Sequence, residues 1–336
     1  MSQYRMGNGA IIAASAALAF AWSIGAAQAV ELRVVATVKP IHALAAAVMH
    51  GVGVPRVLID GAGSPHTFTL KPTDAKTLSA ATVFFRVSEG LEPFTIRIVA
   101  SLPKTVRVVT LENTPGLTLH PLRTGATFEA DDHGPKPAPG ANGGAHTGAA
   151  GHQHHRPVSS ATSAMDGHVW LDPANARVLT AAIADVLAEA APEHAVAFRA
   201  NAKDLIQRLE LLDGEIATAL QPIKGRPYIV FHDAYQYLER RYGLTPAGSV
   251  TLSPDVPPSA RRLTELRRKI ASLKAACVFA EPQFTPKIVE TIVEGTTARR
   301  GTLDPLGAAI AAGPEQYFTL LRGLASDLKS CLVDPA

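Results

Sequence analysis

Apolar and polar positions follow two different periods along this chain. Short, almost continuously apolar runs occur at residues 32–38, 54–59, 83–87, 106–111, 228–231, 248–252, 277–280 and 301–303. Helical sequence, in which apolar residues recur every three or four positions, follows most of these runs. Near-continuous apolar strands that alternate with helices are typical of parallel sheets covered by helices on both faces. The pattern therefore predicts an α/β protein.

Two longer predicted helices separate the two groups of strands. Asp172 and Pro173 form a typical N-cap and first-turn pair for a helix that ends at Ala190. Residues 193–221 carry an apolar stripe at helical spacing, and a helix of that length would span about 43 Å. Two ordinary packed helices would produce the same pattern. Because a strand–helix pattern resumes directly afterwards, we predict two lobes, each a mostly parallel β-sheet flanked by helices, joined by one long helix.

The first 29 residues have the features of a secretory signal peptide. Arg5 is the only charged residue before Glu31, residues 10–21 are small and apolar, and Ala27-Gln28-Ala29 matches an A-x-A cleavage site. The uncharged stretch is also long enough for an uncleaved membrane anchor, but its alanine-rich composition and the cleavage site favour export. The predicted domains are the signal peptide (1–29), an N-terminal lobe (30–192), a connecting helix (193–221) and a C-terminal lobe (222–336).

The composition excludes several classes of function. The chain has 32 Lys and Arg against 29 Asp and Glu, a formal charge of +3, and 47% hydrophobic residues. It is too apolar for a disordered chain and lacks the basic excess of nucleic-acid-binding proteins, so we expect no nucleic-acid partner. Twelve histidines accompany only two cysteines. Four-thiolate zinc modules need more cysteines, so a metal site in this chain would use imidazole and carboxylate ligands.

Candidate ligands follow the ends of several predicted strands. His232, Glu281 and Asp304 each come directly after a strand of the second half. In the first half, His66 follows the second strand through a glycine-containing turn, and His168 precedes a helix start. Ligands of open α/β sheets bind outside the carboxyl ends of the strands. We therefore expect these side chains to converge on one site.

Three neutral imidazoles are typical zinc ligands, whereas manganese, calcium and magnesium prefer oxygen. An ion bound by His66, His168 and His232 would take ligands from both lobes. Asp304, a water molecule or a further histidine remain open as the fourth ligand, and Glu281 fits best behind a histidine. Zinc hydrolases also use three histidines and an open position, with a glutamate as general base. The chain lacks H-E-x-x-H, which favours binding over hydrolysis.

Four segments, in this order, carry a specific pattern: Ser64-Pro65-His66 with Lys71-Pro72-Thr73-Asp74, His168–Pro173, Phe231–Tyr235 and Leu303–Gly307. They resemble the signature segments of the metal-binding solute-binding proteins of ATP-binding-cassette importers, and more narrowly of the zinc-specific type. The resemblance implies a periplasmic, non-enzymatic protein with one Zn²⁺ ion between two lobes. It also implies delivery of the ion to an inner-membrane permease and its ATPase, and we expect a monomer. A surface adhesin, which is a function of distant relatives, would need an anchor or receptor-binding feature that the sequence lacks.

The resemblance implies metal ligands at His66, His168 and His232, with the family's strand-end aspartate at Asp304. Manganese-type relatives carry glutamate at the position of His232, so the histidine favours zinc. Some zinc-type members carry glutamate immediately before the first histidine, where this chain has Pro65. That carboxylate is absent, which leaves the fourth ligand open.

Cys277 and Cys331 are the only cysteines. Export to an oxidising compartment favours a disulfide between them over two free buried thiols, and the pairing also resembles zinc-type members.

Residues 131–164 consist of Gly, Pro, Ala, Ser and His with almost no large apolar residue. Such a segment cannot bury enough surface to fold, so we predict a mobile loop. We expect it to bind additional zinc weakly without being needed for the main site. Its candidate ligands are His133, His146, His152, His154 and His155.

Overall fold

Two four-stranded sheets form the framework of the computed structural model, which describes residues 1, 31–123, 164–251, 254 and 258–333. The strands are β1 (Val34–Val38), β2 (Arg56–Ile59), β3 (Val83–Arg86), β4 (Arg107–Thr110), β5 (Tyr228–His232), β6 (Pro246–Thr251), β7 (Cys277–Ala280) and β8 (Arg299–Thr302). Their orders are β2-β1-β3-β4 and β6-β5-β7-β8, and every pairing is parallel. The predicted α/β class with two parallel sheets is confirmed. The predicted signal peptide and the five histidines of the His-rich segment lie outside the described residues.

The central strands of the two sheets coincide with apolar runs of the sequence, which is why the runs predicted them. The residues of β1, β3, β5 and β7 are buried along the whole strand, which requires continuous apolar sequence. The edge strands differ from the prediction: β6 begins at Pro246 rather than Gly248, and β8 spans Arg299–Thr302 rather than residues 301–303. An edge strand pairs on one side only, so polar residues and an initial proline fit there.

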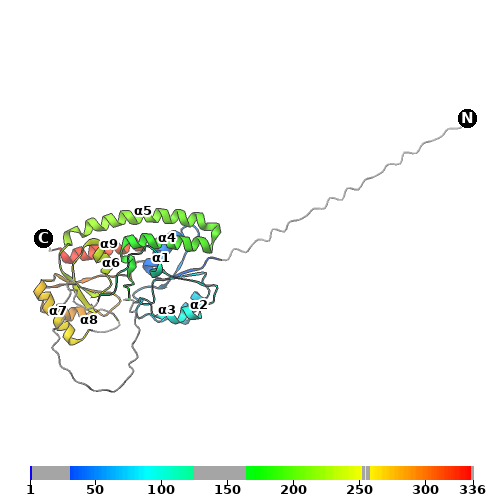
Figure 1. Ribbon diagram of the computed structural model, residues 1–336. Coiled ribbons are helices and arrows are strands. Elements are labelled where there is room, and N and C mark those ends of the chain that lie inside the picture. The colour runs from blue at the N-terminus through cyan, green and yellow to red at the C-terminus, as the bar shows by residue number, and fades with distance from the viewer. Residues whose placement is uncertain (2–30, 124–163, 252–253, 255–257, 334–336) are drawn as a thin grey trace, which may run out of the picture. The chain divides into compact units, whose positions relative to one another are not determined.

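Helices cover both faces of the two sheets (Figure 1). They are α1 (Lys39–Val48), α2 (Pro72–Ser79), α3 (Phe94–Ser101), α4 (Pro173–Ala190), α5 (Ala195–Leu220), α6 (Gln236–Tyr242), α7 (Ala260–Leu273), α8 (Lys287–Val293) and α9 (Gln316–Leu332), with 3₁₀ turns η1 (Leu111–Asn113), η2 (Val169–Leu171), η3 (Pro192–His194) and η4 (Gln221–Ile223). Among the helices of the described residues, none combines the length and apolar composition needed to cross a bilayer.

The long helix α5 packs against both halves of the molecule. Its 26 residues span about 39 Å, and it contacts α1 and α4 from the first half and α9 from the second (Figure 1). The buried face includes Phe198, Leu209 and Ile216. One hydrophobic cluster contains these residues together with side chains from β1 and β5. The two sheets are therefore joined by a continuous core, and not by a flexible linker.

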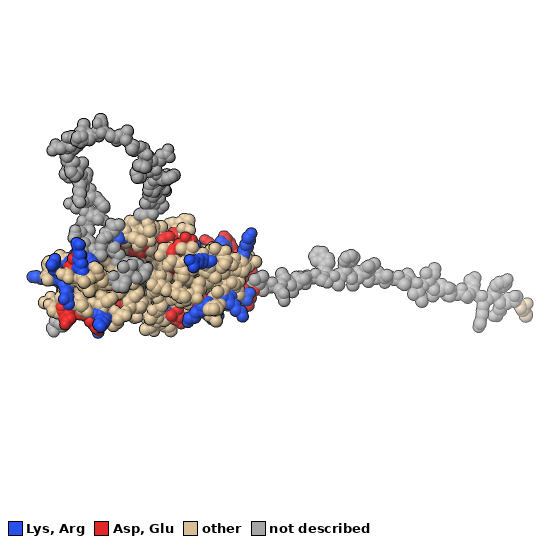
Figure 2. Space-filling view, turned by 90° about the horizontal axis from the view of Figure 1, so that it is seen from below, with Lys and Arg blue, Asp and Glu red and all other residues tan. Residues whose placement is uncertain are grey.

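Charged side chains of both signs lie on the surface. On the face seen in Figure 2, Lys and Arg lie beside Asp and Glu at both ends of the described body. This face is therefore mixed in sign, in keeping with the small net charge of +3.

A disulfide joins Cys277, the first residue of β7, to Cys331 near the end of α9. Their Cα atoms are 6.1 Å apart, and the bond closes a separation of 54 residues. The disulfide predicted from the sequence is confirmed. It ties the C-terminal helix to a central strand of the second sheet.

Replacing both cysteines by alanine should lower the free energy of unfolding by about 4 kcal/mol, because the bond restricts the unfolded chain. Urea unfolding of the oxidised protein and of the Cys277→Ala/Cys331→Ala variant measures the difference. A reducing agent should destabilise the parent protein alone. Equal midpoints for the two proteins would show that the bond adds no stability.

Candidate metal centre

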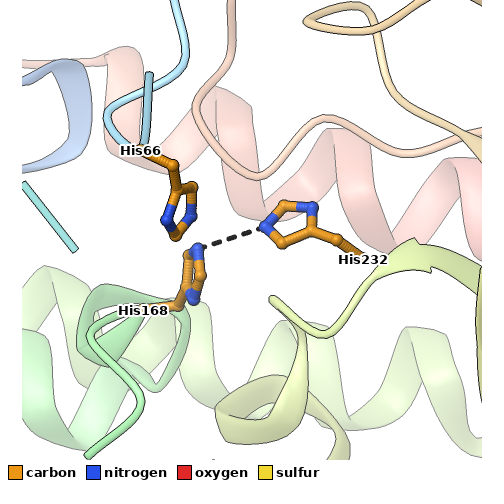
Figure 3. A group of neighbouring side chains, drawn as sticks. All are labelled: His66, His168 and His232. Carbon is orange, nitrogen blue, oxygen red and sulfur yellow. Dashed lines mark hydrogen bonds between the residues drawn. The ribbon is translucent and has the colours of Figure 1, made fainter. Parts of the chain in front are cut away.

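Three histidines from separate parts of the chain meet at one point (Figure 3). His66 lies between β2 and α2, His168 directly precedes η2, and His232 is the last residue of β5. One ring nitrogen of each lies within 4.8 Å of those of the other two. The Nε2 atoms of His168 and His232 are 3.4 Å apart. Within the described parts of the chain, this is the one group of three or more His, Cys, Asp or Glu arranged to hold a metal.

Local structure explains why these side chains converge. His232 stands at the carboxyl end of a central strand, as the strand-end rule predicts. His168 is placed by the short turn η2, which leads into α4, and the Asp172 side chain caps that helix by accepting the Ala174 N–H. The predicted helix start at Asp172-Pro173 is confirmed.

Asp166 holds the ring of His168. Its Oδ1 lies 2.7 Å from His168 Nδ1 and also accepts the backbone N–H of His168 at 3.0 Å. Asp166 is fully buried, and its backbone carbonyl accepts the Tyr237 hydroxyl from the second half. With Nδ1 donating to the carboxylate, the Nε2 lone pair faces His66 and His232. Asp166 was not among the predicted site residues, although a carboxylate two residues before a candidate ligand was a usable signal.

Glu281 plays the same part for His232. Its Oε1 lies 2.8 Å from His232 Nδ1, and both side chains are buried. The predicted position of Glu281, behind a histidine and at the end of β7, matches this geometry. Both His168 and His232 thus present Nε2 to the centre with a carboxylate behind the ring.

Burial controls the protonation of the cluster. Burial, and then repulsion from the other two histidines, lowers the pKa of His66 to about 2. Its Nε2 is buried and has no hydrogen-bond partner. Neutral imidazole nitrogen with an unused lone pair is the form that binds a transition metal, so His66 fits the role of ligand.

The pKa of His232 moves in the opposite direction. Burial by itself lowers it, but the charge of Glu281 and the hydrogen bond to it outweigh burial, so the pKa lies above its usual value of 6.5. The site therefore attracts positive charge at His232 and resists a proton on His66. One divalent cation shared by three neutral imidazoles satisfies both constraints.

Asp304 does not join the three histidines. Its Oδ1 accepts Gln283 Nε2 at 2.7 Å and the backbone N–H groups of Leu306 and Gly307 at 3.1 and 2.9 Å, while Oδ2 accepts the N–H of Ala308. The carboxylate thus fixes the loop after β8, and Asp304 lies outside the group of neighbouring ligand atoms. The expectation that Asp304 binds the metal is not supported by this geometry.

The cavity between the histidines is about 10 Å³, roughly the space that the centre of one water molecule needs. Pro305 and Leu306 from the second half close one side of it. Trp170 Nε1 donates to the Pro305 carbonyl at 2.9 Å, and Lys39 Nζ donates to the Ala308 and Ile310 carbonyls at 2.9 Å each. Contacts from the first half therefore hold this loop over the three histidines.

Comparison with known proteins identifies a matching family, similar sequences and a similar solved structure. The profile of a family described as "ZnuA: Zinc-uptake complex component A periplasmic" matches residues 34–331. The high-affinity zinc uptake system protein ZnuA of Brucella abortus (strain 2308) is 45% identical over 304 residues, which cover 89% of this chain and 91% of the relative. The protein of that name from Yersinia pestis is 34% identical over the same length and shares of the two chains. The solved periplasmic zinc-binding protein TroA from Treponema pallidum is 19% identical with a TM-score of 0.71, and covers 90% of this chain and 99% of its own; at that identity it supports the fold alone.

Replacing Asp166 by alanine should weaken Zn²⁺ binding about 10- to 100-fold, because His168 loses the acceptor that orients its ring. Competition against a chromophoric chelator measures the dissociation constant. Asp185→Ala, on the exposed side of α4, is the matched control and should bind as the parent does. Unchanged affinity in a folded Asp166→Ala protein would contradict the assigned role.

Proposed function

This chain belongs to the family of periplasmic zinc-uptake components, and from that premise we propose that it captures Zn²⁺ with His66, His168 and His232 for delivery to an inner-membrane ATP-binding-cassette permease. The observation that carries the proposal is the convergence of three imidazoles from both halves of the chain, those of His168 and His232 buried and that of His66 partly buried. The names of the relatives support zinc as the cargo.

The donor set supports zinc over manganese. Imidazole nitrogen is a good ligand for zinc, whereas manganese favours carboxylate, carbonyl and water oxygens. Both nearby carboxylates, Asp166 and Glu281, are hydrogen-bonded to the Nδ1 atoms of ligand histidines. They therefore tune the imidazoles and do not supply oxygen ligands.

The cavity supports binding over hydrolysis. A three-histidine zinc hydrolase needs space beside the ion for a water molecule and for the organic substrate. The 10 Å³ cavity has room for about one small sphere. Glu281, the candidate general base, is hydrogen-bonded to His232. This geometry matches a protein that encloses an ion and releases it unchanged.

Export follows from the same assignment. We propose that residues 1–29 direct the chain to the periplasm, the location given in the family description, and are then removed. The oxidising compartment accounts for the Cys277–Cys331 disulfide. The boundaries proposed for the two lobes and the connecting helix, and the expected monomer, stay predictions.

The decisive experiment is metal competition between Zn²⁺ and Mn²⁺ on the parent protein and on the His232→Ala variant. The parent should bind one Zn²⁺ tightly and prefer it strongly over Mn²⁺, and His232→Ala should lose most of that preference. His194→Ala, an exposed histidine after α4, serves as the control and should behave as the parent does. A parent protein that binds Zn²⁺ and Mn²⁺ equally, or that hydrolyses ester or peptide substrates when loaded with zinc, would refute the proposal.

Zinc affinity should depend on pH in a defined direction. A proton and the metal compete for His232, whose pKa lies above 6.5. The apparent affinity is therefore expected to be constant at alkaline pH and to fall as the pH drops through that raised value. Titrations from about pH 8 to about pH 5 test this expectation. A constant affinity over that range would argue against binding by histidine.

A further inference from the structure

Four buried polar atoms of residues around the cavity have no hydrogen-bond partner: Ser64 Oγ, His66 Nε2, Glu281 Oε2 and Gln283 Oε1. Glu281 Oε2 belongs to the carboxylate that pairs with His232 Nδ1, on the side of the ring opposite Nε2, so it lies behind this ligand. Leaving a buried polar atom unpaired is costly, so each unpaired atom calls for a partner. The proposed zinc ion accounts for His66. Gln283 lines the same cavity, and nothing described so far accounts for its unpaired Oε1.

Asp304 determines which end of the Gln283 amide faces the cavity. A carboxylate can only accept hydrogen bonds, so the amide atom that lies 2.7 Å from Asp304 Oδ1 must be the donor, Nε2. The carbonyl oxygen Oε1 then points away from Asp304. Asp304 itself is fixed by three backbone N–H groups of the loop after β8. The orientation of the amide therefore follows from the hydrogen bonds.

The turn that carries Gln283 is also fixed. Phe284 donates its backbone N–H to the Glu281 carbonyl at 3.1 Å. Its ring stacks on Phe231 of β5, with ring centroids 4.8 Å apart, and contacts the ring of His232 edge-on. Gln283 thus lies in a turn between Glu281 and Phe284, and both of these residues contact the metal ligand His232.

The size of the cavity limits what can complete the site. Zinc in proteins binds four ligands in most sites, and the histidines supply three. A cavity of about 10 Å³ has little room beyond the ion, which favours a donor that already lines it. The Glu281 carboxylate is paired with His232 Nδ1, behind the ring. Of the remaining oxygens, those of Ser64 and Gln283, only Gln283 Oε1 is oriented by another residue, whereas the Ser64 hydroxyl is free to rotate.

We propose that Gln283 supplies the fourth zinc ligand through its amide oxygen, and that Asp304 is the positioning residue that turns this oxygen toward the ion. This inference rests on the proposed function and adds a residue to the same site. It also gives Asp304 a role at the site without contact with the metal.

The test uses the full mature chain loaded with Zn²⁺ or with Co²⁺, whose visible spectrum reports the ligand geometry. Gln283→Ala should raise the zinc dissociation constant about 10- to 100-fold, by analogy with losses seen at metal sites. It also makes room for water, so the Co²⁺ spectrum should acquire a pH-dependent change from a metal-bound water, which the parent lacks. Gln283→Leu should weaken binding without that change. Gln207→Ala, at an exposed glutamine of α5, is the matched control and should leave both readouts as in the parent.

Two results would overturn the assignment of Gln283. One is a parent Co²⁺ spectrum that already titrates as a bound water does. The other is parental affinity in both Gln283 variants. If the parent protein binds zinc through its histidines and the Gln283 variants match it, only this inference fails. If the parent protein does not bind zinc tightly, the proposed function itself fails.

The role of Asp304 is tested separately with Asp304→Asn, whose amide no longer forces Gln283 to present Nε2. The variant should weaken zinc binding in the parent background and add little in the Gln283→Leu background, because the two residues act in series. An equal loss in both backgrounds would show that Asp304 acts on the loop and not through Gln283.

Discussion

The structure depends on bringing three imidazole nitrogens to one buried point while keeping them neutral and correctly turned. Burial removes the water that would otherwise form hydrogen bonds with each ring. The ring nitrogen that faces away from the centre therefore needs a hydrogen-bond partner from the protein. Asp166 and Glu281 provide it for His168 and His232. His66 is held neutral by burial, which lowers its pKa to about 2, and by the neighbouring rings. The ligand set is thus organised before the ion arrives, which reduces the cost of binding.

Enclosure of the site comes from contacts between the halves of the chain and not from a mobile hinge. The hydrophobic core runs through α5 from one sheet to the other, which disfavours a large separation of the lobes. Over the site itself, the loop after β8 is held by polar contacts from Trp170 and Lys39. Lys39 also pairs with Asp60 at 2.8 Å. Polar contacts of this kind exchange with water more easily than a packed core separates, so this loop is held less firmly than the core that joins the two sheets.

Much of this arrangement was predictable from the sequence because its causes are local. The buried central strands require continuous apolar runs, and the strand-end rule brings His232 and Glu281 to the site. Arg299 in β8 was unpredictable because an edge strand tolerates polar residues. Asp166 precedes η2 without strand or helix pattern, so its position two residues before His168 was the only sequence signal for the role that its contact with His168 shows. Asp304 satisfied the strand-end rule, yet its carboxylate accepts hydrogen bonds from the backbone N–H groups of the turn that follows, as aspartates in Asx turns commonly do. No sequence pattern shows whether such a carboxylate binds the backbone of its own turn or a metal ion.

Charge explains how such a site can bind a dication with neutral ligands. The three imidazoles contribute no charge, and an amide oxygen from Gln283 would contribute none. The two carboxylates that balance the ion, those of Asp166 and Glu281, lie one hydrogen bond behind the ligands. The raised pKa of His232 is the consequence in the metal-free protein, because a proton there partly replaces the missing positive charge. Placing negative charge behind the ligands still attracts a cation. It also keeps carboxylate oxygen off the metal, where it would favour manganese.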